Sequence, residues 1–234
     1  MSSLRNWIRI FARTPLHPQW LLGGRRIPAG IKTASGTLLD VGAGDRWIAQ
    51  HLRAGVGYVA LDYPATGRDL YGARPDVFAD ARMLPFADAV FDGAICLEVL
   101  EHVSDPALVV AEIARVIRPG GTVWLSMPFL YPLHDAPYDF QRYTEFGLRR
   151  DIERAGMCVV ALRRTSHALR AAGVLACLAV AGGIEARAGL LRWVLLPFAA
   201  AIVLTINLMA WSLSNVWPDW HHMATGHEVE VRKP

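Results

Sequence analysis

Cysteine is scarce in this chain of 234 residues, with Cys96, Cys158 and Cys177 as its only thiols. An odd number of widely spaced cysteines forms no disulfide framework and offers no thiolate cluster to a metal ion. We therefore expect a reducing, cytoplasmic compartment and no metal site. A secretory signal is not expected either, because Arg9 and Arg13 interrupt the early apolar residues and no small-residue cleavage site follows.

Charge is also sparse. Charged residues make up 19% of the chain and the formal net charge is only +3, so the sequence does not imply a nucleic-acid partner. Hydrophobic residues make up 53%, which is enough to form a buried core and excludes a disordered chain. The length suits one large domain, or one domain with an appendage.

Apolar runs alternate with helical periodicity through most of the chain. Strands are expected at residues 37–41, 57–62, 77–79, 91–97, 122–127 and 157–162, with a half-exposed strand at 227–232. Helices are expected after the first strand to about residue 53, at 105–117, and at 144–155 with Thr144 as N-cap. Strands that alternate with helices predict a doubly wound α/β fold with a mostly parallel sheet.

A glycine-containing loop follows the first predicted strand, with the sequence Val41-Gly42-Ala43-Gly44-Asp45. Glycines allow a sharp turn and a close approach of the backbone to a ligand, and an α-helix starting there would offer free N–H groups. Such a loop is typical of a nucleotide pocket. Trp47 stands where the dinucleotide fingerprint requires its third glycine, which disfavours a pyrophosphate ligand and a nicotinamide-dependent reductase.

Two acids end the following strands. Asp62 ends the second strand and can accept hydrogen bonds from both hydroxyls of a ribose. Asp80 follows the third strand and could accept from an adenine amino group. The alternative for either acid is a helix cap or a solvated loop position. Together with the glycine loop, the two acids favour an adenosyl ligand.

Five ordered segments carry a family resemblance. They read Leu38-Leu39-Asp40-Val41-Gly42-Ala43-Gly44, Asp80-Ala81-Arg82-Met83-Leu84-Pro85-Phe86, Phe91-Asp92, Glu98-Val99-Leu100-Glu101-His102-Val103 and Arg115-Val116-Ile117-Arg118-Pro119-Gly120-Gly121. The series resembles class I S-adenosylmethionine-dependent methyltransferases, the type 11 group in particular. The resemblance covers about residues 36–165 and the last strand.

This resemblance implies a seven-stranded Rossmann-like sheet with S-adenosylmethionine as cofactor. Gly42 and Gly44 would line its methionine part, Asp62 would hold the ribose, and Leu97 would face the sulfonium. Asp80 and the residue after it would meet the adenine. The predicted cofactor site comprises Asp40, Gly42, Ala43, Gly44, Asp62, Tyr63, Asp80, Ala81 and Leu97.

Arg46 departs from the family pattern, in which the loop often has a third small residue. The side chain could change the contacts of the loop with the cofactor, or it could be a solvent-exposed residue of the first helical turn. A second class of function therefore stays open, in which the protein binds the cofactor or acts as a scaffold without catalysis.

The loop after the fifth strand carries the candidate catalytic residues. The methyl donor is already activated, so methyl transfer needs positioning, and a base only if the acceptor loses a proton. We expect His134 to be that base, Asp135 or Asp139 to orient either His134 or the acceptor, and Arg142 to bind an anionic acceptor group. The alternative is a solvated loop with one buried Arg–Asp pair. His102 is interpreted as a structural residue or part of the pocket wall.

An apolar insertion separates the last two strands. Residues 168–184 and 190–213 predict a helical hairpin, and residues 193–213 carry no charge. The last two strands of this family pair antiparallel in one sheet, so an insertion between them must leave the sheet and return to it. If it crosses a membrane, it must do so an even number of times. Charges at the bend would be costly to carry across a bilayer; they are Glu185, Arg187 and Arg192.

We therefore expect the hairpin to lie in the cytoplasmic face of the cell membrane or to enter it only partly. A basic amphipathic helix expected at residues 3–13 would assist this contact. The alternative is a soluble lid or dimer face. The predicted organisation is an N-terminal segment at 1–30, a methyltransferase domain at 31–165 with 225–234, and an insertion at 166–224. The predicted acceptor is a small or a lipid- or sugar-linked molecule with an O, N or C nucleophile.

Overall fold

The computed structural model describes residues 14–65 and 74–234, so the helix predicted at 3–13 lies outside the described residues. The chain divides into two compact units. Of the described residues, the sheet unit comprises 26–65, 74–129, 133–164 and 226–234, and the hairpin unit comprises 14–25, 130–132 and 165–225.

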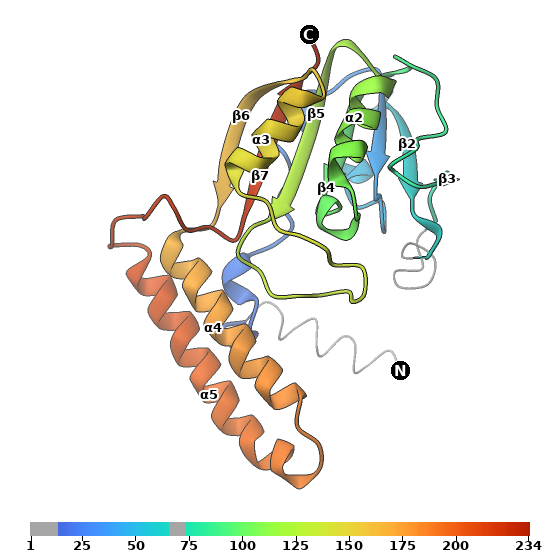
Figure 1. Ribbon diagram of the computed structural model, residues 1–234. Coiled ribbons are helices and arrows are strands. Elements are labelled where there is room, and N and C mark those ends of the chain that lie inside the picture. The colour runs from blue at the N-terminus through green and yellow to red at the C-terminus, as the bar shows by residue number, and fades with distance from the viewer. Residues whose placement is uncertain (1–13, 66–73) are drawn as a thin grey trace. The chain divides into compact units, whose positions relative to one another are not determined.

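The sheet unit is built on a seven-stranded sheet (Figure 1). Its strands are β1 (Thr37–Val41), β2 (Gly57–Asp62), β3 (Val77–Phe78), β4 (Phe91–Leu97), β5 (Ile117–Pro128), β6 (Cys158–Thr165) and β7 (Gly226–Arg232). Their order is β3-β2-β1-β4-β5-β7-β6. The first five strands pair in parallel and β7 pairs antiparallel with β5. This confirms the predicted mostly parallel, doubly wound sheet.

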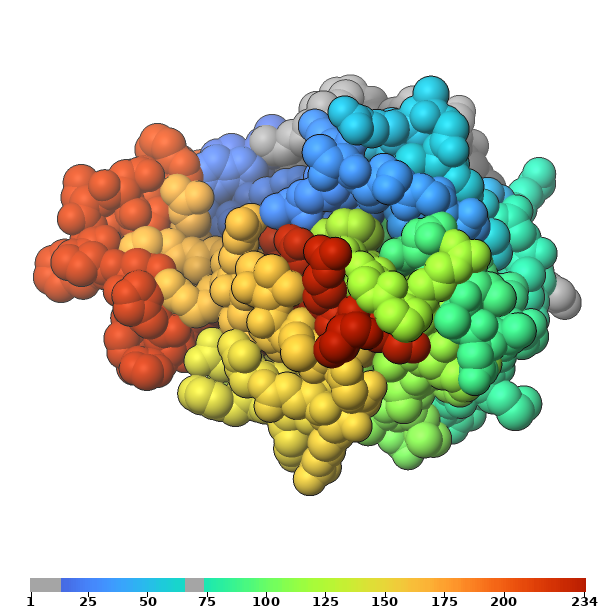
Figure 2. All heavy atoms as spheres, turned by 90° about the horizontal axis from the view of Figure 1, so that it is seen from above, coloured from blue at the N-terminus to red at the C-terminus, as the bar shows by residue number. Residues whose placement is uncertain are grey.

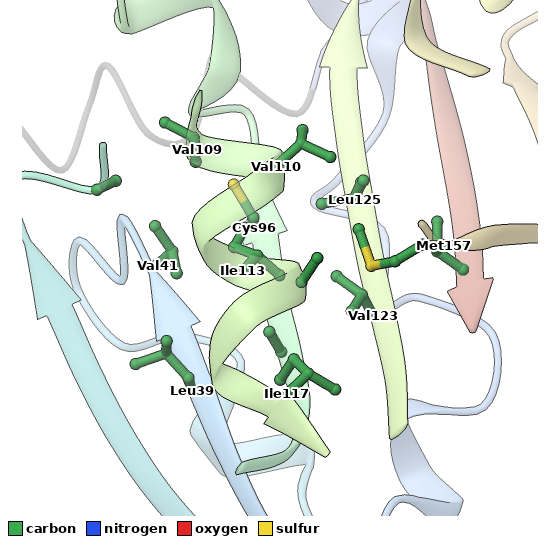
Figure 3. Packing of buried hydrophobic residues seen from close by; sticks show 14 of the residues in the cluster. Leu39, Val41, Cys96, Val109, Val110, Ile113, Ile117, Val123, Leu125 and Met157 are labelled. Carbon is green, nitrogen blue, oxygen red and sulfur yellow. The ribbon is translucent and has the colours of Figure 1, made fainter. Parts of the chain in front are cut away.

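The two faces of the sheet bury different side chains because successive residues of a strand point to opposite sides. Leu39 and Cys96 belong to the larger core, which packs against α2 (Pro106–Val116) and α3 (Glu145–Arg154). Figure 3 shows side chains of β1, β4 and β5 directed at α2. On the other face, Leu38, Ile95 and Trp124 form a second core with Ile31.

Both helices begin at capping residues. The Asp105 side chain accepts a hydrogen bond from Leu108 N–H and Pro106 occupies the first helical position of α2. The Thr144 hydroxyl accepts from Gly147 N–H at 3.2 Å, which confirms the predicted N-cap of α3.

The helix expected to follow β1 is wrong. Only a 3₁₀ turn, Ala49–His51, forms there. Arg46 has a φ of +58°, a left-handed conformation that interrupts an α-helix. The residues between Arg46 and the start of β2 at Gly57 form turns around this 3₁₀ segment, and Gly55 also has a positive φ, of +88°.

Strand β5 begins earlier than expected, at Ile117 instead of residue 122. Residues 118–121 form an irregularity within the strand, where the register of the β4–β5 pairing shifts between Phe91 and Gly93. Gly120 N–H donates to the Lys233 carbonyl at 2.8 Å, and Lys233 N–H donates to the Gly121 carbonyl at 3.0 Å. Figure 2 shows the C-terminal residues, in dark red, at the surface beside this irregularity.

The hairpin unit contains α4 (Ala168–Glu185) and α5 (Leu190–Leu213), which is consistent with the predicted hairpin. Asn207 is fully buried there. Its amide donates to the carbonyls of Pro15 and His17 at 2.7 and 3.0 Å, and it accepts from the Cys177 thiol. The outer face is apolar and exposed, with Phe198 at 64% exposure. Among the described residues, these two helices are long and apolar enough to cross a membrane.

Candidate cofactor and acceptor sites

The carboxyl ends of the parallel strands meet at one edge of the sheet. Val41 is in register with Leu61 on one side and Cys96 on the other, and Leu97 is in register with Ser126. The loops that follow β1, β2 and β4 therefore begin side by side. Ligands of open α/β sheets bind at this edge.

The glycines of the β1 loop have different tasks. Gly42 has a φ of +72°, and a Cβ at this position would lie 2.3 Å from the Val99 side chain, so packing within the chain already requires glycine. The N–H groups of Gly42 and Ala43 both donate to the Leu61 carbonyl. At Gly44, where φ is +51°, a Cβ would point into open space. Gly44 is thus the position with room for a ligand.

Asp62 is almost fully buried and faces this loop. Its carboxylate accepts from Gly44 N–H and from Tyr63 N–H, both at 2.8 Å. Burial raises the pKa of Asp62, and the two N–H groups oppose this rise. A carboxylate has about four acceptor positions, so hydrogen bonds from ribose hydroxyls can be added. The residues at this point fit the ribose of S-adenosylmethionine.

Asp40 lies deeper than the predicted cofactor site suggests. Its carboxyl group is buried and accepts a hydrogen bond from the Tyr58 hydroxyl. Burial raises the pKa of Asp40 to about 7, and the Tyr58 hydrogen bond partly opposes this. The side chain therefore binds a neighbouring strand within the sheet unit.

Asp80, predicted to contact the adenine, already accepts hydrogen bonds from a neighbouring side chain. The Asp80 carboxylate accepts from the guanidinium of Arg82 at 2.6 Å, which lowers the pKa of Asp80. Arg82 also donates to the Ser104 hydroxyl at 2.8 Å. An adenine amino group would therefore share Asp80 with Arg82. Ala81 is buried and Leu97 is half-buried at the end of β4.

The side chain of Arg46 contacts other residues of the sheet unit. Its guanidinium donates to both oxygens of Asp76, at 2.9 and 3.2 Å, and lies 5.2 Å from the centre of the Tyr58 ring. Asp76 also accepts from Ala60 N–H in β2. The arginine thus links the β1 loop to the start of β3, and its left-handed φ is one that the family's glycine would adopt without strain.

The predicted acceptor loop is fixed to the turn after β4. The Gln141 amide donates to the carbonyls of Leu100 and Val103, at 2.5 and 2.7 Å. Phe140 N–H donates to the carbonyl of Glu101 at 2.8 Å. The loop is therefore held at the same sheet edge as the glycine loop.

Three of the loop's side chains form one cluster. The ring nitrogen Nδ1 of His134 lies 3.1 Å from Oδ2 of Asp139, and the backbone N–H of His134 donates to the same oxygen at 2.8 Å. Arg142 donates to both oxygens of Asp139, which is 2% exposed and whose pKa this pairing lowers to about 2. Asp139 is thus the acid that contacts Nδ1 of His134, which also lies 3.5 Å from the Arg142 guanidinium, while Asp135 has a left-handed backbone conformation. Arg142 and Asp139 therefore form an Arg–Asp pair, as expected in the alternative interpretation of this loop as a solvated structural segment.

Sequence reasoning missed Glu101, which is fully buried next to this cluster. Neither carboxylate oxygen has a hydrogen-bond partner among the described residues. Its Oε1 lies 3.7 Å from Nε2 of His102, and the His102 and His134 rings are 4.9 Å apart. Burial raises the pKa of Glu101 well above its usual range, and the negative charge of Glu98 adds to this. The available signal was the pair of glutamates directly after β4.

A hollow of about 410 Å³ lies at the opposite edge, where β1 and β4 begin. Asp92 in its wall accepts from Thr37 N–H and from the Arg118 guanidinium. The charges there serve contacts within the chain, so the carboxyl edge remains the candidate site.

The chain is similar in sequence to known methyltransferases. Residues 39–125 match a family model described as a methyltransferase domain. Over 123 residues the chain is 32% identical to a ubiquinone biosynthesis O-methyltransferase of Thiobacillus denitrificans, covering 48% of this chain and 53% of that protein. It is 38% identical over 115 residues to an uncharacterized methyltransferase of Mycobacterium marinum, covering 43% and 44%. The chain thus matches about half the length of these relatives.

Solved structures show the same fold at low identity. A putative sarcosine dimethylglycine methyltransferase from Galdieria sulphuraria has a TM-score of 0.54 at 15% identity, covering 87% of this chain and 80% of that one. A Burkholderia thailandensis 1,6-didemethyltoxoflavin-N1-methyltransferase, solved with S-adenosylhomocysteine, has a TM-score of 0.50 at 17% identity and covers 99% and 84%.

Proposed function

We propose that this chain, in which residues 39–125 match a methyltransferase domain, is an S-adenosylmethionine-dependent enzyme that methylates an O, N or C nucleophile of a small or a lipid- or sugar-linked acceptor. The observation that carries this proposal is the pairing of Gly44 with Asp62 beside open space, at the edge that also holds the His134 loop. When bound, the cofactor supplies a methyl group on a positively charged sulfur.

The residues of the chain would then have separate roles in cofactor binding and proton transfer. Gly44 leaves room for the cofactor and Asp62 accepts from its ribose hydroxyls. His134 takes the proton of the acceptor; because its Nδ1 faces Asp139, the nitrogen that takes the proton is Nε2. Asp139 stabilises the resulting imidazolium, and Arg142 holds Asp139 in place. Arg142 stays the candidate for contact with an anionic group of the acceptor, and Asp135 stays a candidate for orienting the acceptor.

A His134→Ala variant tests the proposed base. We expect its methyl transfer to fall about 100-fold or more, while calorimetric titration shows unchanged binding of S-adenosylmethionine. The His51→Ala variant is the matched control, because His51 lies in the 3₁₀ turn outside this cluster. Unchanged turnover of His134→Ala would remove this residue from the mechanism.

Oxygen acceptors are the first class to test, because the name of the Thiobacillus denitrificans relative specifies an O-methyl transfer. The experiment is mass spectrometry of cell-envelope lipids and glycans from a strain that lacks the gene, with the complemented strain as control. We expect one compound to lose the mass of a single methylene group. Identical profiles in both strains would direct the search to soluble acceptors.

A second candidate function is cofactor binding without catalysis. It is favoured by Arg46, which occupies a position where the family often has a small residue. Calorimetry with S-adenosylmethionine followed by a methyl-transfer assay separates the two candidates. Binding without transfer to any tested acceptor class would favour the non-catalytic protein.

The exposed hairpin supports a further part of the proposal, that residues 168–213 contact the cytoplasmic face of the cell membrane. At about 1.5 Å per residue, the 24 residues of α5 are about 36 Å long, enough to enter a bilayer. Trp193 is 68% exposed near the bend, and Trp217 and Trp220 are exposed after the helix. The charged bend favours shallow insertion, with 166–224 as an insertion within the methyltransferase domain.

Cell fractionation tests this contact. We expect the full-length protein to sediment with membranes and to require detergent for release, and a variant without residues 168–220 to stay in the supernatant. A protein that stays in the high-speed supernatant in both forms would contradict membrane contact. Sedimentation velocity would then distinguish a lid on a monomer from a dimer face.

A further inference from the structure

Glu101, His102 and His134 converge beside the acceptor loop. Each offers one ligand atom, and these atoms all lie within 4.8 Å of one another. Glu101 and His102 come from the turn after β4, and His134 comes from the loop after β5. The hydrogen bonds of Gln141 and Phe140 to this turn hold the two segments together.

Both imidazoles are oriented through the same ring nitrogen. His102 Nδ1 lies 2.6 Å from the Tyr138 carbonyl, which can only accept, so this nitrogen carries the proton. His134 Nδ1 lies 3.1 Å from a carboxylate oxygen of Asp139 and 3.5 Å from the Arg142 guanidinium, and we assign its proton from the shorter contact, with the carboxylate. In each ring Nε2 is then the nitrogen with the lone pair. Histidines that bind metals in proteins are typically held in this way, by a carbonyl or a carboxylate on the second nitrogen.

Glu101 provides an independent observation. Its side chain is fully buried, and both of its oxygens lack a hydrogen-bond partner among the described residues. Buried carboxylates are normally paired or bound to a cation, because leaving water without a partner is costly. Its Oε1 is nearest to Nε2 of His102, at 3.7 Å. The unsatisfied acid thus faces the same point as the imidazole.

We propose that Glu101, His102 and His134 bind a divalent first-row transition metal ion, with Zn²⁺ as the reference ion. Two imidazoles and one carboxylate are a donor set of catalytic sites that keep a position open for a substrate or water. Around tetrahedral zinc, with bonds of about 2.0–2.1 Å, donor atoms are about 3.3 Å apart, so these side chains must move inward by about 1 Å. The scarcity of cysteine gave no indication of a site made only of histidine and glutamate.

The ion would serve the acceptor, and this part rests on the proposed function. With His134 as a ligand, the ion instead of the imidazole would favour loss of the proton from an acceptor hydroxyl to water. The oxygen would then form its bond to the methyl carbon as the carbon–sulfur bond of the donor breaks. The metal site thus favours an oxygen nucleophile.

Metal titration of the full-length, chelator-treated protein tests the site without any turnover. We expect saturable binding of one Zn²⁺ by calorimetry and visible absorption bands with Co²⁺. The Glu101→Gln and His102→Gln variants should bind at least 100-fold more weakly. The controls are Glu153→Gln and His51→Gln, which lie outside the cluster and should bind as the original protein does. Circular dichroism checks that each variant is folded.

Absence of saturable binding, or binding that Glu101→Gln and His102→Gln leave unchanged, would overturn the metal site. Titration with S-adenosylmethionine keeps the two proposals apart. If Co²⁺ binds through these residues but the cofactor does not bind, the metal site stands and the proposed function fails. If the cofactor binds and methyl transfer proceeds without metal, the methyltransferase stands and the role of the ion in it fails.

Discussion

Helices α2 and α5 are both apolar, but the chain covers only one of them. Six of the 11 residues of α2 are buried in the sheet unit, whereas only four of the 24 residues of α5 are buried in the hairpin unit. The two charged residues of α2, Glu112 and Arg115, lie outside its buried face, whereas α5 has no charged residue after Arg192. Hydrophobicity alone therefore does not say whether the chain, a lipid surface or another protein covers a helix.

The core of the sheet unit should show the largest effect. Ile113 of α2 is fully buried against β1 and β4, so Ile113→Ala should lower the free energy of unfolding by about 2–5 kcal/mol. Leu108→Ala is the control, because Leu108 is 49% exposed on the same helix and should cost about 0.5 kcal/mol or less. Urea unfolding followed by circular dichroism measures both. Equal costs would break the contrast between covered and exposed faces.

The titration of Asp40 tests how strongly burial in the sheet unit disfavours a charged side chain. Its folded pKa of about 7 is above the unfolded value, so the protonated form stabilises the fold, and this contribution is lost as pH rises from about 4 through 7. Over about three pH units the loss is up to about 4 kcal/mol. Asp40→Asn should remove this slope and be the more stable protein at pH 8. Unfolding at pH 5 and pH 8 measures it, and an unchanged slope would contradict the assignment.

Tyr58→Phe is the companion variant. The Tyr58 hydroxyl donates to Asp40 and lowers the pKa of that carboxyl, so its removal should raise the pKa further. We expect the loss of stability to extend to higher pH than in the original protein. A downward shift would show that another group controls Asp40.

Variants of Arg46 test how much a half-exposed ion pair and a left-handed backbone angle contribute to the stability of the sheet unit. Arg46→Ala loses the Asp76 pair and keeps a left-handed φ, whereas Arg46→Gly loses the pair and relieves the strain. We expect the alanine variant to be less stable than the glycine variant by about 1 kcal/mol. Calorimetry should show S-adenosylmethionine binding to Arg46→Gly at least as tightly as to the original protein. Equal stabilities would mean that the backbone there relaxes freely.

Phe198 should show the smallest effect on folding. It is exposed on α5, so Phe198→Ser should change the free energy of unfolding by about 0.5 kcal/mol or less. Binding to liposomes should weaken about tenfold or more, because the apolar ring no longer enters the lipid. Ala199→Ser is the matched control on a buried neighbouring position, and should leave liposome binding unchanged. Equal liposome binding by both variants would indicate a protein partner for this face.

The sheet could be predicted because its strands are apolar runs that end in recognisable residues. Leu38 and Leu39 are both apolar because each faces a different core, and Asp62 marks the end of its strand. The helix after β1 could not be excluded, because periodicity does not report the backbone angle of a single residue such as Arg46.

The acceptor cluster was predictable in part. The sequence indicated His134 and left Asp135 and Asp139 as equal candidates, since both are near in the chain. The choice depends on the two hydrogen bonds that Arg142 makes to Asp139, which spacing does not specify. Glu101 was missed because its significance depends on burial and on a loop more than thirty residues away in sequence.

The position of β7 has a consequence for the order of assembly. β7 lies between β5 and β6, yet it is synthesised after both helices of the hairpin. While a ribosome is still making residues 166–225, β5 and β6 lack the strand that belongs between them, and their exposed edges can pair wrongly. The sheet is completed only when Gly226–Arg232 emerges. The edges of β5 and β6 that β7 will occupy therefore stay open until the hairpin and its flanking residues have been made.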